Sequence, residues 1–175
     1  MDTRLVVLAG AVFVTLLLEA MLSRRHERAL RRRGAIEPAN DVHRLMAVAY
    51  PGAFLAMVAE SVLRGSPPHA WLLPGVTLFV LAKAVKYSAI RALGERWTFR
   101  VLVLPGEPLV VRGPYRFMRH PNYVGVAGEL VGSTLAFGAW VVGPLATILF
   151  LALVARRMAV EEAALARFAP PRRQS

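Results

Sequence analysis

Long apolar blocks constrain the fold of this chain more than any other feature of its sequence. A helix of about 20 apolar residues is long enough to cross the ~30 Å hydrocarbon core of a bilayer. The chain has 175 residues, and its apolar blocks cover residues 5–22, 45–63, 71–90 and 123–155. These blocks predict an all-α, polytopic membrane protein, because helices satisfy their own backbone hydrogen bonds in lipid. Almost nothing is left for a soluble domain.

The last block is too long for a single membrane span. Its 33 residues would form a helix about 50 Å long at ~1.5 Å per residue, well beyond the thickness of the hydrocarbon core. Gly138, Gly143 and Pro144 lie near its middle and disfavour a continuous helix. We therefore expect five transmembrane helices, with the last two forming a helical hairpin.

The distribution of arginine supports the same division. Between and after the five predicted spans, the arginines number seven, one, six, none and five. Because basic residues are enriched in cytoplasmic loops, this alternation predicts a multi-pass protein with an outside N-terminus and a cytoplasmic C-terminus. The block at residues 5–22 is expected to be a retained span rather than a signal peptide, because only Arg4 precedes it and no clear cleavage site follows.

Charge and cysteine content exclude several function classes. The chain carries 22 Lys and Arg against 11 Asp and Glu, a formal net charge of +11, yet 56% of its residues are hydrophobic. Basic proteins that bind nucleic acid are rarely so apolar, so we expect no nucleic-acid partner. The chain has no cysteine, which excludes disulfides, thiolate metal sites and a cysteine nucleophile, and no metal site is predicted.

Residues 1–175 are predicted to form one membrane domain with a single sizeable loop at about residues 93–122. Prolines and glycines interrupt this loop from Pro105 to Pro121, and residues 100–105 and 109–112 are expected to be short extended pieces around a turn. A structured loop on the basic side of the protein is where we expect a functional site. The C-terminal hairpin and helix at about residues 122–168 would complete that site.

The most specific local sequence is GPYRFMRHPNYVG at residues 113–125, which leads from the loop into the fourth predicted span. Pro121 suits the first position of that helix, because its ring fixes φ and its missing N–H needs no partner there. Arg119 and His120 would then lie at a helix N-terminus, which favours anionic groups. The simpler interpretation is a basic loop that binds lipid headgroups.

A second cluster, RRMAVEE at residues 156–162, ends the fifth predicted span. Arg157 and Glu161 are four residues apart, so the simpler interpretation is an ion pair on one helix face. However, both clusters are predicted to lie on the same side of the membrane in adjacent spans. We therefore expect them to converge on one site.

Together the two motifs resemble those of the isoprenylcysteine carboxyl methyltransferase family, which are integral membrane enzymes that use S-adenosylmethionine. This resemblance covers residues 100–168. The sequences SRRHERALRRRGAIEP and LGERWTFRVLVLPGEPLVVRGPY are similar to a bacterial branch that methylates long-chain alkylpyrones and phenolic lipids. Longer eukaryotic relatives have an FGxxYxxY-like segment where this sequence reads ALARFAPPRRQS, which disfavours a prenylated-protein substrate.

The resemblance implies roles for individual residues. Arg157 matches the arginine on the substrate side, where a guanidinium can hold an oxyanion, and Arg100 is a second candidate for substrate contact. Aromatic faces can lie near the sulfonium cation, while backbone groups and a carboxylate can hold the adenosine. The implied cofactor contacts are Leu109, Val110, Tyr115, His120, Pro121, Asn122, Tyr123 and Glu161.

Ionisable residues inside the predicted spans need partners or a cavity, because charge is costly in lipid. Lys83 and Lys86 are expected to pair with Glu60 or Glu19, or to extend to the membrane–water interface. Glu129 is expected to face the site as a catalytic base or an orienting group, with an internal ion pair as the alternative. The residues concerned are Glu19, Glu60, Lys83, Lys86 and Glu129.

The sequence therefore predicts a membrane methyltransferase that uses S-adenosylmethionine to methylate an oxygen of a lipophilic substrate. The oxygen would belong to a carboxylate, enol or phenol, for example in an alkylpyrone or isoprenoid-type lipid, and Arg157 would hold the oxyanion during in-line displacement. Membrane lipids are expected around the protein, with no obligate protein partner. The alternatives are a phospholipid N-methyltransferase, an NADPH-dependent lipid reductase and a non-catalytic lipid-binding protein.

Overall fold

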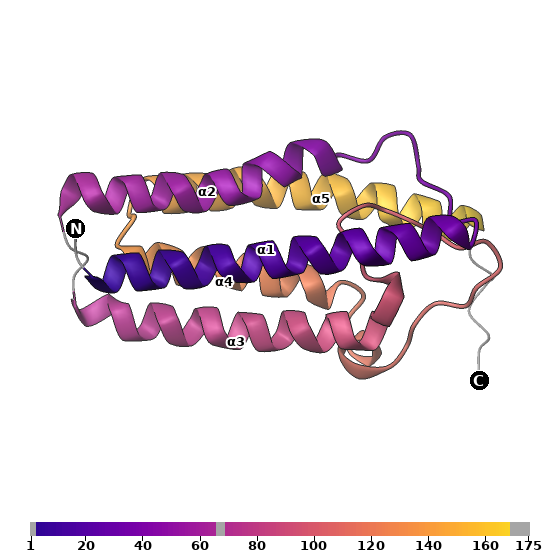
Figure 1. Ribbon diagram of the computed structural model, residues 1–175, viewed down its shortest axis with the longest axis horizontal. Helices are drawn as coiled ribbons and strands as arrows, with labels where there is room; N and C mark the ends of the chain where they lie inside the picture. The colour runs from indigo at the N-terminus through magenta and orange to yellow at the C-terminus, as the bar shows by residue number, and fades with distance from the viewer. Residues whose placement is uncertain (1–2, 66–68, 169–175) are drawn as a thin grey trace.

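The computed structural model describes residues 3–65 and 69–168, and over these residues the protein is a bundle of α-helices without strands (Figure 1). The all-α prediction is thus confirmed. Arg172 and Arg173, which belong to the basic tail of the topology prediction, lie outside the described residues. The elements are α1 (Thr3–Arg32), α2 (His43–Arg64), α3 (His69–Leu93), η1 (Gly94–Arg96), η2 (Gly113–Arg116), α4 (Pro121–Phe137) and α5 (Val142–Phe168).

Four of these helices, α1, α2, α3 and α5, are long and apolar enough to cross a membrane. The helix α4 has 17 residues and is about 26 Å long at ~1.5 Å per residue, slightly less than the hydrocarbon core. The helix break expected near Gly138 is present. Gly138 adopts φ +64° and ends α4, and the N–H groups of Gly138 and Ala139 bond back to Leu135 and Thr134.

The helices α3 and α4 approach each other closely because glycines face the contact. A Cβ atom on Gly75 would lie 2.4 Å from the backbone nitrogen of Ala136, and one on Gly132 would lie 2.7 Å from that of Phe79. Neither position has room for a larger side chain. Small residues are the usual means by which membrane helices bring their backbones together.

Four buried charged side chains connect three helices in the middle of the bundle, and we call them the inner cluster: Glu19 of α1, Lys83 and Lys86 of α3, and Glu129 of α4. Lys83 Nζ lies 2.6 Å from Glu19 and 2.9 Å from Glu129, and Lys86 Nζ lies 2.6 Å and 3.2 Å from the same carboxylates. Tyr50 of α2 donates a hydrogen bond of 2.8 Å to Glu129. The cluster has two positive and two negative side chains, and it links α1, α3 and α4 in addition to the apolar core.

The two lysines were expected to pair with Glu60 or Glu19, and the pairing with Glu19 is confirmed, whereas Glu60 is not their partner. The carboxylate of Glu60 instead accepts the backbone N–H groups of Val141 and Val142, at 3.0 Å and 2.6 Å. Val142 is the first residue of α5 and Val141 precedes it, so Glu60 accepts free N–H donors at a helix N-terminus, where a negative charge is favourable. Arg64 of the same helix pairs with Glu60 at 2.9 Å.

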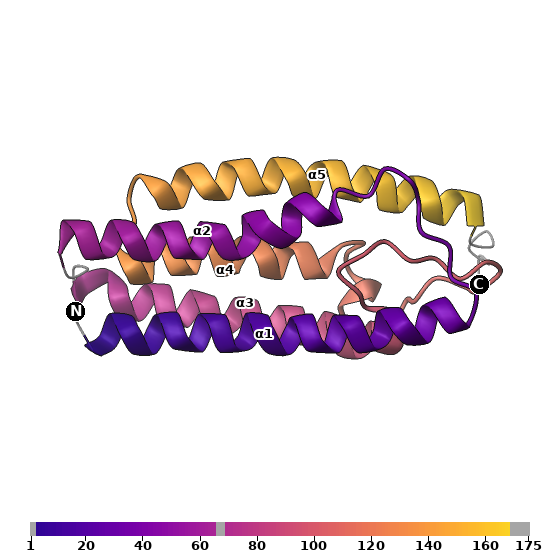
Figure 2. The ribbon, with the colours of Figure 1, turned by 45° about the horizontal axis from the view of Figure 1, so that its top comes forward.

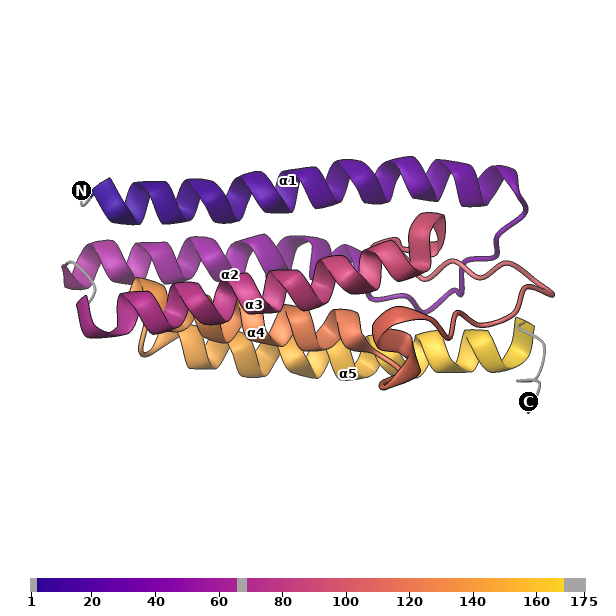
Figure 3. The same ribbon diagram turned by 90° about the horizontal axis from the view of Figure 1, so that it is seen from below.

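The longer connections gather at one end of the bundle, where α1, α3 and α5 end (Figures 2 and 3). The expected extended piece at residues 100–105 pairs through Val103 with Ile36 in the α1–α2 connection, as a single antiparallel bridge. The backbone N–H of Gly106 then bonds to the carbonyl of Phe168 at 3.0 Å. The α1–α2 connection and the loop at residues 96–110 thus cover this end of the helices together, and we call them the roof.

Candidate functional site

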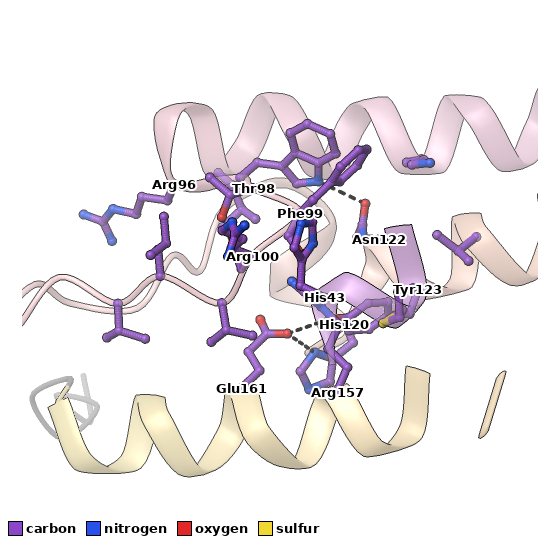
Figure 4. Close-up of a pocket in the computed structure, with 18 of the residues that line it drawn as sticks. His43, Arg96, Thr98, Phe99, Arg100, His120, Asn122, Tyr123, Arg157 and Glu161 are labelled. Atoms are coloured by element: carbon purple, nitrogen blue, oxygen red, sulfur yellow. Dashed lines mark hydrogen bonds and ion pairs between the residues drawn. The ribbon is translucent and has the colours of Figure 1, made fainter. Parts of the chain in front are cut away.

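A cavity of about 1040 Å³ lies beneath this roof and extends into the bundle. The loop at residues 96–110, the start of α4 and the end of α5 supply its polar wall, and Figure 4 shows these side chains facing one another. Its other wall is apolar and comes mainly from α1 and α2, for example Phe13, Leu17, Met46 and Pro51. The cavity therefore joins a polar end to an apolar end, as an amphipathic ligand requires.

Four side chains form a hydrogen-bonded chain at the polar wall, and we call them the cavity cluster: Asp41, Tyr123, Arg157 and Glu161. The last three line the cavity, whereas Asp41 is buried and reaches it only through Arg157. Arg157 donates from Nη1 to Asp41 at 3.1 Å and from Nε to the Tyr123 hydroxyl at 2.8 Å. The Tyr123 hydroxyl donates to Glu161 Oε2 at 2.9 Å. The arginine and the glutamate of the second motif are thus linked through the tyrosine of the first.

His120 and Pro121 open α4 as the sequence predicts. Pro121 is the first residue of the helix and is fully buried, so it supports the wall without lining the cavity. His120 lines the cavity, and its Nε2 lies 3.1 Å from Glu162 Oε1 while its Nδ1 lies 3.9 Å from Glu161 Oε2. The histidine therefore connects the start of α4 to both glutamates of α5, confirming that the two motifs converge.

Asn122 and Trp97 attach the loop to the start of α4. The Trp97 indole N–H donates to Asn122 Oδ1 at 3.1 Å, and both residues line the cavity. The loop is also bound to α1, because the Ser23 hydroxyl accepts the Phe99 N–H at 2.8 Å and His26 Nδ1 lies 2.8 Å from the Trp97 carbonyl. These bonds fix the polar wall from two sides.

Arg100 lines the cavity, but carboxylates of α1 and its following loop occupy much of its hydrogen-bonding capacity. It lies 2.6 Å from Glu37 and 3.3 Å from Glu27. The bond to Glu37 raises the pKa of Arg100. Burial raises the pKa of Glu37, but the bonds from Arg100 and Arg31 outweigh it and lower that pKa overall. Arg100 therefore fastens the roof as well as facing the cavity.

Leu109, Val110 and Tyr115 also line the cavity, as the family resemblance implied. Burial, and secondarily the negative charge of Glu161, raise the pKa of Tyr115, so its hydroxyl stays protonated at neutral pH. Its ring is therefore a neutral aromatic surface near a carboxylate. Such a surface and carboxylate can both attract a cation.

Glu129 does not line the cavity. Its side chain is fully buried in the inner cluster, against Lys83, Lys86 and Tyr50. The arrangement is thus the internal ion pair, the alternative to a base facing the site. The sequence placed Glu129 on the correct helix, but the lysines of α3 occupy its carboxylate.

Sequence reasoning missed Asp41, which binds Arg157, and His43, which lines the cavity. The Asp41 carboxylate accepts the N–H groups of His43 and Val101, at 3.0 Å and 2.8 Å, besides its bond to Arg157. His43 lines the cavity, and its Nδ1 lies 3.1 Å from the Phe99 carbonyl. The available signal was an aspartate two residues before a helix, which usually indicates only a local turn.

Comparison with known proteins identifies similar sequences over most of the chain. Residues 75–167 match the isoprenylcysteine carboxyl methyltransferase (ICMT) family. The uncharacterized protein YpbQ of Bacillus subtilis is 32% identical over 147 residues, which is 84% of this chain and 88% of that protein. An uncharacterized protein of Haemophilus influenzae is 27% identical over 150 residues, covering 85% and 87% of the two chains.

A plant enzyme is also similar. Protein-S-isoprenylcysteine O-methyltransferase B of Arabidopsis thaliana is 30% identical over 122 residues, which is 65% of this chain and 60% of that enzyme. No solved structure matches. The matched region at residues 75–167 contains the loop, the start of α4 and the end of α5, which form the polar wall of the cavity.

Proposed function

Since this chain belongs to the isoprenylcysteine carboxyl methyltransferase family, we propose that it transfers a methyl group from S-adenosylmethionine to an oxygen of a lipophilic acceptor. The acceptor is a long-chain alkylpyrone, a phenolic lipid or an isoprenoid-type lipid. The observation that carries this proposal is the cavity, where the two family motifs meet at the polar end and an apolar wall continues into the bundle.

The residues of the polar end fit S-adenosylmethionine, which when bound supplies a methyl group on a positively charged sulfur. Glu161 offers a carboxylate with 32% of its side chain exposed, and Tyr115 and Tyr123 offer aromatic faces beside it. His120 and Asn122 add polar groups at the start of α4. A cavity of about 1040 Å³ is at the upper end of the usual range for small-molecule sites, so cofactor and acceptor both have room.

The apolar wall fits the hydrocarbon tail of the acceptor. Side chains of α1 and α2 line the cavity below the polar end, and these helices are long and apolar enough to lie in the bilayer. A lipid tail would enter from the membrane between helices, while the cofactor would enter from the cytosol. This division explains why a methyltransferase for such a substrate is itself in the membrane.

Arg157 would orient the reacting oxygen. Its guanidinium is held by Asp41 and Tyr123, which leaves donors directed at the cavity that it lines. An enol, phenol or carboxylate oxygen is already largely anionic, so no strong base is needed, and the reaction depends on alignment and removal of water. This is why we assign the catalytic role to Arg157 and leave Glu129 in the structural inner cluster.

Arg100 is the second proposed contact to the acceptor. It lines the cavity, but Glu37 and Glu27 share its guanidinium. Its contribution should therefore be smaller than that of Arg157.

We further propose that α4 crosses the membrane as the fifth span, with the basic end of the bundle in the cytoplasm. The chain has no cysteine, so single cysteines can report topology directly. Val141→Cys lies between α4 and α5, and Met118→Cys lies in the basic loop. A membrane-impermeant maleimide should label the first in intact cells and the second only after lysis. Labelling of both in intact cells would refute the orientation.

The direct test of function is the affinity of the purified protein for S-adenosylhomocysteine, the product form of the cofactor. Wild-type protein should bind it, and His120→Ala and Glu161→Ala should each bind at least about tenfold more weakly, because each loses a contact to a polar or charged group. Glu95→Gln, whose side chain is 64% exposed away from the cavity, is the matched control. Wild-type protein without affinity would end the methyltransferase proposal.

Analysis of the methylated lipids then identifies the acceptor atom. Lipid extracts from cells with and without the protein should differ by a species heavier by one methylene, with the methyl group on oxygen. A methyl group on the amine of a phospholipid headgroup would establish the N-methyltransferase alternative. That reaction would keep the cofactor site but would not need Arg157 to hold an anion.

A further inference from the structure

Arg157 and Glu161 are close enough in sequence to neutralise each other. They are separated by one helical turn on α5, the spacing at which arginine and glutamate form ion pairs on a helix surface. Such a pair would join the proposed oxygen-holding group to the proposed cofactor contact. It would also occupy hydrogen-bonding groups that the cofactor and the methyl acceptor need.

The structure has a different arrangement. The ion pair of Arg157 within the described residues is with Asp41, at 3.1 Å, while Glu161 accepts its hydrogen bond from Tyr123. Both partners of the Arg157–Asp41 pair are buried, with 7% and 4% of their side chains exposed, whereas Glu161 remains 32% exposed on the cavity. The more buried carboxylate therefore binds the arginine, and the more accessible one faces the cavity.

Two backbone N–H groups hold the carboxylate of Asp41 in place. Its Oδ1 accepts the His43 N–H at 3.0 Å and its Oδ2 accepts the Val101 N–H at 2.8 Å. These donors belong to the start of α2 and to the loop over the cavity, so two chain segments fix the carboxylate independently of its bond to Arg157. The two donors on separate segments hold the carboxylate in one position.

We infer that Asp41 is a positioning residue that prevents Arg157 from pairing with Glu161, and so keeps Glu161 available to the cofactor and Arg157 directed at the acceptor. This inference rests on the proposed function. Without the negative charge of Asp41, the guanidinium of Arg157 turns along α5 to Glu161, one helical turn away. A residue of the α1–α2 connection thereby controls cofactor affinity without touching the cofactor.

The test is a double-mutant cycle on the full-length protein in detergent, with S-adenosylhomocysteine as the probe. Asp41→Asn should weaken its affinity about tenfold, because Glu161 is then engaged by Arg157. Arg157→Gln alone sets the reference affinity, because it lacks the guanidinium but keeps Asp41. The double variant Asp41→Asn, Arg157→Gln should regain that affinity, since no arginine remains to occupy Glu161.

Recovery in the double variant separates this role from a structural one. The double variant still lacks the carboxylate that binds the Val101 N–H, so damage to the loop would persist in it. If Asp41→Asn does not fold, the double variant is still compared with Arg157→Gln, because removing both charges of a buried pair costs less than removing one. A double variant that binds about tenfold more weakly than Arg157→Gln would overturn the inference.

Unchanged affinity in Asp41→Asn would also overturn it. Glu95→Gln serves as the control for loss of an acidic group elsewhere on the loop side of the protein. Failure of this inference is distinguishable from failure of the proposed function, because the latter requires that wild-type protein bind no S-adenosylhomocysteine at all.

Discussion

The inner cluster and the cavity cluster are both made of buried charged side chains, yet they differ in how their hydrogen-bonding capacity is used. In the inner cluster each ammonium lies within 3.2 Å of both carboxylates, and none of the four side chains is more than 8% exposed. Lys86 of the inner cluster and Arg157 of the cavity cluster both line the cavity of about 1040 Å³, but of the two clusters only the cavity cluster has a largely accessible charge, Glu161, with 32% of its side chain exposed. A buried charge therefore indicates a site only where some of its capacity remains open to a ligand.

The difference also separates stability from activity. The inner cluster joins α1 to α3 and α4 through Glu19, so its loss should affect the fold first. The cavity cluster belongs to the ends of helices and to loops, which are anchored by several independent hydrogen bonds. Its loss should affect ligand binding and transfer first.

Glu19→Ala should have the largest effect on stability. It leaves Lys83 and Lys86 with a single carboxylate between them, and an uncompensated buried charge costs about 3–5 kcal/mol in the free energy of unfolding. Thermal or denaturant unfolding of the purified protein in detergent measures this loss. The exposed Glu95→Ala is the control, and an unfolding free energy equal to that of wild type would show that the inner cluster is not structural.

Arg157→Gln should have the largest effect on methyl transfer. The rate should fall about 100-fold or more, because a group that holds a developing or existing oxyanion in a dry site contributes at this scale. The unfolding free energy should fall less than in Glu19→Ala. Arg100→Gln is the comparison variant, and its rate should fall less because Glu27 and Glu37 share that guanidinium. Equal losses in both variants would contradict the assignment of Arg157.

Tyr123→Phe should have an intermediate effect. It removes the hydroxyl that accepts from Arg157 and donates to Glu161, while it keeps the aromatic ring. The rate of transfer should fall about tenfold, as expected for loss of hydrogen bonds to charged groups. Initial rates with labelled S-adenosylmethionine measure it. A rate within twofold of wild type would mean that the link between the two motifs has no functional role.

Glu37→Gln should have the smallest effect, and it should depend on pH. The pKa of Glu37 is below 4.5 because hydrogen bonds from Arg100 and Arg31 outweigh its burial. Its ionised form therefore stabilises the fold above about pH 4.5, and this contribution is lost as pH falls through the lower pKa of the folded state. Wild-type protein should lose more stability than the variant between about pH 5 and 3.

Between about pH 6 and 8 the difference in unfolding midpoint between wild type and Glu37→Gln should not change with pH, since Glu37 is ionised in both the folded and the unfolded state there. A pH-dependent difference in that range would mean that another group controls the roof of the cavity.

The residues of the two motifs show what local sequence can predict. The proline at the start of α4, the glycine at its end and the length of the apolar blocks each depend on properties of a few adjacent residues. The helices, their break near Gly138 and the convergence of His120 with the glutamates of α5 were predictable for that reason. The two family motifs also name six residues that line the cavity: Tyr115, His120, Asn122, Tyr123, Arg157 and Glu161.

The ionic partners show where that approach stops. The periodicity of α3 placed its two lysines on one face, and Glu19 or Glu60 was the expected partner, whereas the lysines pair with Glu19 and Glu129. The choice of Glu129 over Glu60 depends on the close contact of α3 and α4, for which Gly75 and Gly132 must lie against the facing backbone. Helix packing of this kind is not encoded in any single segment.

The sequence by itself determined that this protein is a helical membrane protein of a methyltransferase family, because composition, helix ends and contiguous motifs are local properties. Only the tertiary structure decided how the charges are shared. Asp41 and Arg157 are 116 positions apart, and their contact arises because the loops meet over one end of the bundle. That contact replaces the Arg157–Glu161 pair that sequence spacing favours, since a buried carboxylate with fixed donors holds the guanidinium away from its neighbour on α5.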